Sequence, residues 1–262
     1  MTAPATPSAH APATTPSVRA AAAVFVACCL VVLILMKLSG VSYEHFFDTT
    51  TTTQRSAVPP LAVGAALLVA VLWKTRWRVM RDQGPRLRMG FRRADHRPAA
   101  GRSVVGEPHP RARRRCPARQ RAGRFHEETL LRGNILTALR GRLRTEAAAA
   151  GVTTLWFGLF HLTNLALGEP GAVLQVGLAT LTGLGFYLAR RDTGTLVAAM
   201  VLHGAWDFAS FLAGVAPNED GALAQAGSFC IAVIYPLAAI SFVVLLVRDR
   251  NTPALAPSQR TD

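Results

Sequence analysis

The chain has 262 residues, of which 50% are apolar and 17% charged, and its formal net charge of +14 comes almost entirely from residues 76–124. Because soluble domains carry about 25% charged residues, this composition excludes an ordinary soluble globule and is typical of a membrane protein. The four cysteines form no Cys-x-x-Cys pair and no regularly spaced framework, which excludes a disulfide-rich fold and a cysteine-based zinc module.

The N-terminal part of the chain predicts a tail followed by two membrane spans. Residues 1–18 are rich in Ala, Pro, Thr and Ser and contain no acidic residue, so we expect a disordered tail. Residues 20–36 and 57–73 are uncharged apolar runs that approach the length of a bilayer crossing. Because no small-residue cleavage site follows the first run before Lys37, it is interpreted as an anchor and not as a removed signal peptide.

Four longer apolar runs downstream predict four further transmembrane helices, at residues 147–167, 171–189, 195–215 and 227–247. Arg residues precede the first of these runs, separate the second from the third, and follow the fourth, whereas the other two connections contain no Lys or Arg. By the positive-inside bias, the Arg-rich connections and both chain termini lie in the cytoplasm. We therefore predict an all-α fold in the cell membrane: a polytopic helix bundle of about six long spans plus a short motif-bearing helix.

Four polar side chains inside the predicted spans are costly to place in a bilayer and need a reason. His161 and Asn164 are three residues apart, and His203 and Asp207 are four residues apart. Each pair therefore projects from one face of its helix toward a common interior.

A third polar cluster, Glu127, Glu128 and Arg132, opens a short helix before the third span. At about 100° per residue, Glu128 and Arg132 lie about 40° apart around the helix, and Glu127 and Arg132 about 140° apart. Glu128 is therefore the expected ion-pair partner of Arg132, and Glu127 is left to face elsewhere. Two imidazoles and this carboxylate could deprotonate one water, either directly or through a divalent metal that lowers the pKa of the water. The pattern indicates hydrolysis.

Each motif also has an interpretation without catalysis. Glu128 and Arg132 are the kind of pair found on helix surfaces, and a lone intramembrane histidine is often a hydrogen-bond donor between helices. His203 and Asp207 could satisfy only one another, and Phe157 could be a packing residue. The joint occurrence of these motifs is what favours a site.

These residues resemble the CPBP intramembrane proteases, which are CAAX prenyl protease-like and are also called the Abi family. The family pattern is E-E-x-x-x-R, then F-x-x-x-H, then H-x-x-x-N/D on successive membrane helices. Within residues 125–210 it is matched by Glu127, Glu128, Arg132, Phe157, His161, His203 and Asp207. The resemblance implies a helical membrane endopeptidase in which Glu127 activates the water and the Glu128–Arg132 pair orients the helix.

The resemblance further implies that His161, His203 and Asp207 position the water or ligate a metal, with Phe157 and Asn164 in support. The enzyme would then be a glutamic or a metallo-endopeptidase, and its cofactor is none or a divalent metal such as zinc. The implied partners are a peptide or protein substrate, prenylated or otherwise membrane-associated, and the lipid bilayer; no nucleic acid is expected. Two alternatives stay open: a non-catalytic member of the same fold, and a small transporter that uses the buried His and Asp.

Residues 76–124 depart from the family pattern, which leads us to expect a further hydrophobic helix there. Sixteen Arg stand against three acidic residues, without usable periodicity. Three interpretations stay open: an arm that binds nucleic acid, a polybasic segment that binds anionic lipid, and a frameshifted or disordered stretch that would leave the enzyme inactive. The predicted domains are the tail 1–18, two helices in 19–75, the basic segment 76–124, the catalytic membrane domain 125–248 and a disordered tail 249–262.

Overall fold

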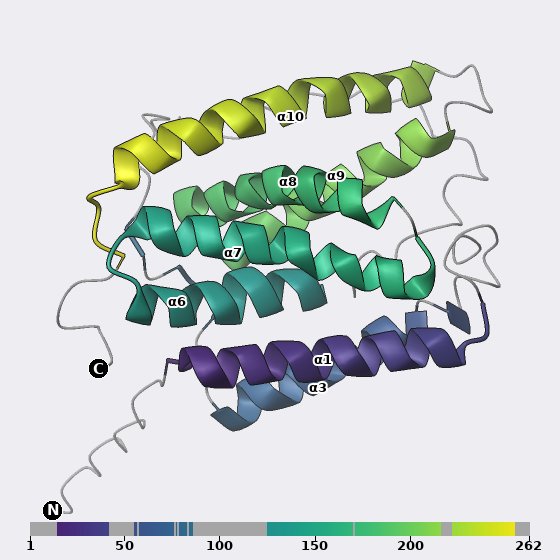
Figure 1. Ribbon diagram of the computed structural model, residues 1–262, viewed down its shortest axis with the longest axis horizontal. Coiled ribbons are helices and arrows are strands. Elements are labelled where there is room, and N and C mark those ends of the chain that lie inside the picture. Colours follow the sequence, from purple (N-terminus) through teal and green to yellow (C-terminus); the bar gives the residue numbers. More distant parts are fainter. Residues whose placement is uncertain are drawn as a thin grey trace, which may run out of the picture.

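The computed structural model describes residues 15–41, 55–56, 58–75, 77, 79–82, 84–85, 125–169, 171–215 and 222–254. All regular elements in these ranges are helices, so the predicted all-α membrane bundle is confirmed (Figure 1). The expected disordered N-terminal tail up to residue 14, residues 86–124 of the basic segment and residues 255–262 of the C-terminal tail lie outside the described ranges.

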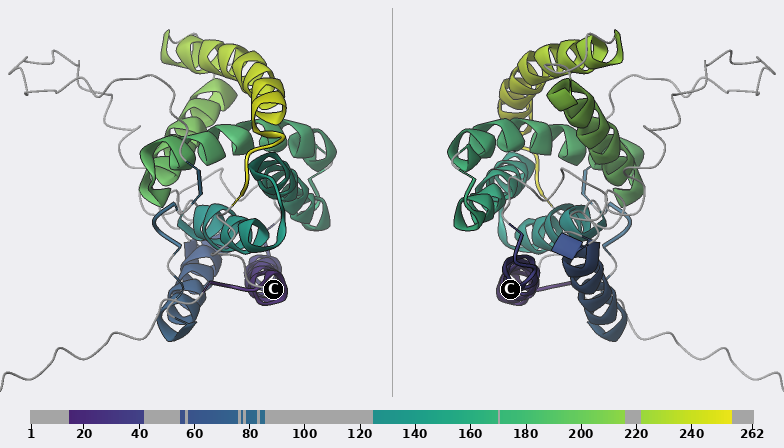
Figure 2. Two further views of the ribbon diagram at one scale, coloured as in Figure 1. Left: turned by 90° about the vertical axis from the view of Figure 1, so that its left-hand side faces the viewer. Right: turned by 90° about the vertical axis from the view of Figure 1, so that its right-hand side faces the viewer.

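The helices follow one another across the bundle. They are α1 (Val18–Leu38), α3 (Val58–Thr75), the π-helical η2 (Thr129–Ile135), α6 (Leu136–Arg142), α7 (Glu146–Phe160), the 3-10 helix η3 (His161–Leu167), α8 (Ala172–Thr193), α9 (Leu196–Val215) and α10 (Ala222–Asp249). The η2–α6 segment contacts both α1 and α7, whereas α8 packs on α7, α9 and α10. Figure 2 shows the α1–α3 pair and the α9–α10 pair at opposite edges, which leaves the η2–α6 segment between them.

Five helices in the described ranges are long and apolar enough to cross a membrane: Val18–Leu38, Val58–Thr75, Glu146–Leu167, Ala172–Thr193 and Ala232–Asp249. A shorter apolar helix, Leu196–Ser210, stands where the fifth of the six predicted spans was expected. Because a bilayer crossing needs about 20 apolar residues, these helices make the chain a multi-pass membrane protein.

The outward faces of the spanning helices carry large apolar side chains. Leu30 and Ile34 on α1, and Leu237 and Ile240 on α10, are each more than half exposed. Lipid tails are as apolar as these side chains, so such a surface is stable in a bilayer, although it would be an aggregation hazard in water.

Residues 125–142 form one continuous helical segment, which begins as an α-helix, passes through η2 and ends with α6. Every residue of η2 is buried, including the charged Arg132. A helix buried on all its faces belongs to the core of a bundle, and π-helical turns are rare elements that occur frequently at functional sites. This segment therefore places the E-E-x-x-x-R motif in the centre of the protein.

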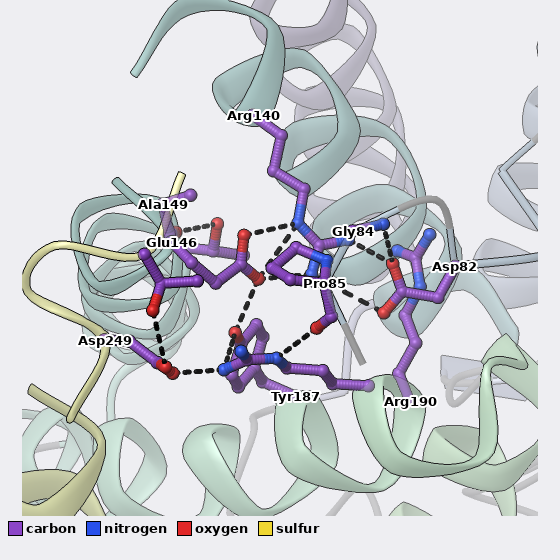
Figure 3. A network of polar contacts seen from close by, with 12 residues as sticks. Asp82, Gly84, Pro85, Arg140, Glu146, Ala149, Tyr187, Arg190 and Asp249 are labelled. Atoms are coloured by element: carbon purple, nitrogen blue, oxygen red, sulfur yellow. Dashed lines mark hydrogen bonds and ion pairs between the residues drawn. The ribbon is translucent and has the colours of Figure 1, made fainter. Parts of the chain in front are cut away.

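A network of polar contacts closes the end of the bundle where α6 and α8 end and α7 begins (Figure 3). Arg140 of α6 pairs with both Asp82 and Glu146, and Tyr187 of α8 donates a hydrogen bond to Glu146 at 2.6 Å. Burial alone would raise the pKa of the Asp82 carboxyl, but the charges of Arg140 and Arg190 outweigh burial and hold that pKa below its ordinary value.

The same network holds the first residues of the basic segment against the bundle. The Gly84 N–H donates to Oδ1 of Asp82 at 2.9 Å, and a Cβ on Gly84 would collide with the Arg140 guanidinium. Arg191 of α8 donates to the carbonyl oxygen of Pro85 at 2.6 Å. The described residues of this stretch thus occupy a defined place, which the composition of residues 76–124 did not predict. Arginines of α6 and α8 bind these residues, and their backbone also pairs with Gly194 and Leu196.

Candidate active site

The centre of the site is a chain of polar contacts that runs from Arg132 through Glu128 to His203. Arg132 Nη1 donates to Oε1 of Glu128 at 3.2 Å, and His203 Nδ1 donates to the same oxygen at 2.9 Å. Glu128 and Arg132 are fully buried, and His203 is 6% exposed. The ion pair expected from the helical spacing of Glu128 and Arg132 is therefore present, and α9 adds a histidine to it.

The other nitrogen of His203 faces two further carboxylates. His203 Nε2 lies 3.5 Å from Oδ1 of Asp207 and 3.8 Å from Oε2 of Glu127. Because Nδ1 donates to Glu128, Nε2 of the neutral ring carries no hydrogen and is an acceptor. The distance of 3.8 Å is too long for a direct hydrogen bond and is in the range that a bridging water spans. The structure thus brings Glu127, Glu128, His203 and Asp207 together.

His161 lies at the point where α7 ends and η3 begins. Its Nδ1 is 2.9 Å from the carbonyl oxygen of Phe157, one turn earlier, so Nδ1 donates and Nε2 is left as the acceptor of the neutral ring. The Phe157 ring makes edge contacts with both imidazoles, with centroids 5.0 Å from His161 and 5.8 Å from His203. The two predicted histidines therefore flank one aromatic ring.

Asn164 makes its polar contact with helix α8. Its Nδ2 donates to Oε1 of Gln175 on α8 at 2.8 Å. Sequence reasoning did not single out Gln175, because a lone glutamine in an apolar run has no motif to mark it. The η3 helix ends at Leu167 and is capped by Gly168, whose φ of 96° lies in the left-handed region and lets the chain turn toward α8.

Two residues of α8 contact the motif side chains, although neither belongs to a motif. Arg132 Nη2 donates to the carbonyl oxygen of Gly183 at 2.7 Å, and the ring of Phe186 stacks on the imidazole of His203. The Arg132 guanidinium also lies 4.0 Å from the centroid of the Phe157 ring, within the range of a cation–π contact. Sequence reasoning missed Gly183 and Phe186, since glycine and phenylalanine are ordinary residues in a membrane helix.

His126, next to the two glutamates, is buried where its helix meets α3. In the described part of the chain neither of its ring nitrogens has a hydrogen-bond partner. A Cβ on Gly64 of α3 would lie 3.0 Å from His126 Nε2 and 2.7 Å from a methyl group of Val32. The absence of a side chain at Gly64 therefore lets α3 approach both α1 and the motif helix.

The residues predicted as metal ligands do not assemble into a ligand set. Among the described residues, no group of three or more His, Cys, Asp or Glu side chains is arranged to hold a metal ion. Both nitrogens of His203 face carboxylates, and Nδ1 of His161 is directed at a backbone carbonyl. A protein zinc site needs at least three converging donors, so His161, His203 and Asp207 as placed do not fit one.

Comparison with known proteins places these motifs in one family. Residues 122–209, about a third of the chain, match the family described as Type II CAAX prenyl endopeptidase Rce1-like. The match contains all three motifs. No curated protein and no solved structure matches the chain. The resemblance that the motifs predicted is therefore confirmed for residues 122–209, which are similar to the Rce1-like family.

Proposed function

We propose that this membrane protein is an intramembrane endopeptidase of the CAAX prenyl protease-like type, which hydrolyses a peptide bond near the membrane surface. The observation that carries the proposal is the convergence of Glu127, Glu128, His203 and Asp207 inside an apolar bundle. Ionisable groups are costly at membrane depth and mark functional sites there. The similarity of residues 122–209 to the Rce1-like family supports peptide hydrolysis.

Glu127 acts as the general base. Its side chain is 21% exposed, whereas that of Glu128 is fully buried and is the acceptor for both Arg132 and His203. A water held between Glu127 Oε2 and His203 Nε2 would give one proton to Glu127 while its oxygen attacks the scissile carbonyl carbon. Glu127 would then pass that proton to the nitrogen of the leaving amine, which completes the hydrolysis and restores the carboxylate.

The remaining groups orient this water. Glu128 accepts from His203 Nδ1, and so leaves Nε2 as an acceptor for the second hydrogen of the water. Arg132 donates a hydrogen bond to Glu128 and so holds its carboxylate in place. His161 is held by the Phe157 carbonyl at the end of α7 and would bring an acceptor, Nε2 of its neutral ring, to the water. The proposed mechanism uses protein groups alone, because no three His, Cys, Asp or Glu side chains in the described ranges are arranged to hold a metal ion.

The proposed substrate is a membrane-associated peptide, prenylated or otherwise anchored in the bilayer. We place the protein in the cell membrane with both chain ends in the cytoplasm, because the Arg-rich connections favour that side. Residues 125–248 form the proposed catalytic domain, and residues 19–75 contribute two helices in front of it.

The test is hydrolysis of a farnesylated peptide that ends in a Cys-a-a-X sequence and carries a quenched fluorophore. The full chain would be assayed in vesicles. We expect cleavage by the wild-type protein and none by Glu127→Gln, because an amide cannot accept the proton of the water. Glu169→Gln, at the turn before α8, is the matched control and should keep the wild-type rate.

Turnover of Glu127→Gln at the wild-type rate would contradict the general-base role. A folded wild-type protein that cleaves neither farnesylated nor unmodified membrane peptides would contradict the proposed peptidase activity. The non-catalytic and transporter alternatives would then be tested in its place.

A further inference from the structure

Helix α8 carries none of the three motifs, yet it contacts two motif side chains from different helices. Gly183 and Phe186 are three residues apart, so they lie on one face of α8, and both are buried. The first contacts Arg132 of the motif helix, and the second contacts His203 of α9. These two side chains are the ones that bind Oε1 of Glu128.

Gly183 leaves room for the Arg132 guanidinium. Its carbonyl oxygen accepts a hydrogen bond from Arg132 Nη2 at 2.7 Å, in addition to its place in the helix. A Cβ on Gly183 would lie 2.6 Å from that Nη2 and 2.8 Å from Cδ1 of Phe157. Cβ atoms essentially never show non-bonded contacts shorter than 3.0 Å, so even an alanine would require Arg132 or Phe157 to shift. The position needs glycine for space and not for its backbone freedom.

The ring of Phe186 lies against the ring of His203. The two rings are stacked, with centroids 4.5 Å apart and planes 14° apart. The hydrogen bond from Nδ1 to Glu128 lies close to that plane when it is well directed, and so does the lone pair of Nε2 on the side of Glu127. A tilt of the ring would therefore weaken the hydrogen bond to Glu128 and turn the Nε2 lone pair away from the water at the same time.

Phe157 connects these two contacts. Its ring packs edge-on against Phe186 with centroids 5.9 Å apart, and its face carries the Arg132 guanidinium. The guanidinium is also 5.4 Å from the centroid of Phe186. One pair of aromatic rings, from α7 and α8, thus holds both the cation and the imidazole that bind Glu128.

We propose that Gly183 and Phe186 are positioning residues of the peptidase. Gly183 sets the place of Arg132 and through it of Glu128, and Phe186 sets the ring plane of His203 so that Nε2 faces the water beside Glu127. This inference rests on the proposed function. Both residues act through other side chains, so their substitution should lower kcat and leave KM nearly unchanged.

The first experiment uses glycine variants of α8 in the farnesylated-peptide assay. Gly183→Ala should lower kcat on the order of 10- to 100-fold, since small misplacements of catalytic groups have effects of that size. Gly177→Ala and Gly185→Ala are matched controls, because a Cβ at either position meets nothing within 4 Å. Alanine favours a helix more than glycine does, so a loss confined to Gly183→Ala cannot come from a weaker α8.

The second experiment separates the aromatic ring from the apolar volume at position 186. Phe186→Leu should lower kcat at least 10-fold with KM within about twofold, and Phe186→Tyr, which keeps a flat ring, should restore most of the rate. Phe229→Leu on α10 is the control, because that side chain is 71% exposed. A wild-type kcat for Phe186→Leu, or a loss of equal size in Phe186→Tyr, would overturn the role of the ring.

A spectroscopic signature tests the positioning without turnover. The protein would be labelled with ¹⁵N-histidine and studied by NMR, and the His203 resonances would be identified by their loss in His203→Gln. In the wild-type protein these resonances should report a single tautomer, with the hydrogen on Nδ1. Phe186→Tyr and Gly185→Ala should keep this signature, whereas Phe186→Leu should show mixed tautomers. Wild-type protein that has the signature but cleaves no peptide would contradict the proposed function alone. An unchanged signature in Phe186→Leu would contradict the positioning role.

Discussion

His203 donates from Nδ1 to Oε1 of Glu128 at 2.9 Å, although the two residues are 75 positions apart in the chain. This hydrogen bond gives two adjacent glutamates different environments. Glu128 is fully buried and is bound by Arg132 and His203, whereas Glu127 is partly exposed and lies 3.8 Å from the opposite nitrogen of the same imidazole. Glu128 already accepts two hydrogen bonds and Glu127 does not accept either of them. This difference is the physical basis for assigning Glu127 as the base and Glu128 as the orienting residue.

The same substitution should mainly affect activity at Glu127 and mainly affect stability at Glu128. Glu127→Gln should abolish cleavage and leave the thermal unfolding temperature unchanged, because it removes only the proton acceptor. Glu128→Gln should keep measurable turnover but lose about 3 kcal/mol of unfolding free energy, since it leaves the buried Arg132 without its counter-charge. Peptide cleavage and thermal unfolding in detergent measure the two effects. Complete loss of activity in Glu128→Gln, with normal stability, would point to Glu128 as the base.

Stability should depend on pH through Asp82. The pKa of Asp82 is lower in the folded chain than its ordinary value because Arg140 and Arg190 lie beside it and outweigh the effect of burial. Its stabilisation is therefore present above the unfolded pKa of about 4 and is lost as the pH falls through the lower folded pKa.

We expect Asp82→Asn to cost about 3 kcal/mol near pH 7, because it leaves the buried Arg140 short of one counter-charge. The difference in unfolding temperature between wild type and Asp82→Asn should shrink as the pH falls below about 4. Thermal unfolding across a pH series measures this difference. A constant difference over the whole range would show that the Asp82 charge does not stabilise the fold.

Tyr187→Phe should destabilise the polar network without touching the site. It removes the hydrogen bond to Glu146 at 2.6 Å and the one from Arg191 at 3.2 Å, and should cost about 1–3 kcal/mol of unfolding free energy. Tyr235→Phe on α10 is the matched control, since that side chain is only half-buried. Equal unfolding temperatures for the two variants would argue against a stabilising role for the network.

Chelation should leave the activity intact. His161, His203 and Asp207 do not form a ligand set, so the proposed mechanism uses Glu127 and the histidines on water alone. Purified protein would be analysed for bound metal and assayed before and after treatment with a strong chelator, with an established zinc peptidase as the positive control. A stoichiometric metal whose removal and return switch the activity off and on would establish a metallopeptidase.

Residues 79–82 and 84–85 show where composition misleads. Sixteen Arg in residues 76–124 led us to treat the whole stretch as one basic segment. The structure separates its beginning, where Asp82 pairs with Arg140 and the carbonyl of Pro85 accepts from Arg191. A backbone carbonyl has no side-chain signature, so contacts of this kind cannot be predicted from residue types.

The sequence by itself determined the helices and the local pairs. Apolar runs of about 20 residues must satisfy their own backbone hydrogen bonds in a bilayer, and so they become helices wherever they occur. The pairing of Glu128 with Arg132 needs only the spacing of one helical turn. Only the tertiary structure decided that His203 binds Glu128 through Nδ1, that Asn164 turns to Gln175, and that Gly183 and Phe186 hold two motif side chains. These contacts depend on which faces of α8 and α9 meet the motif helix, and helix packing sets that geometry through many small side-chain contacts that leave no pattern in the chain.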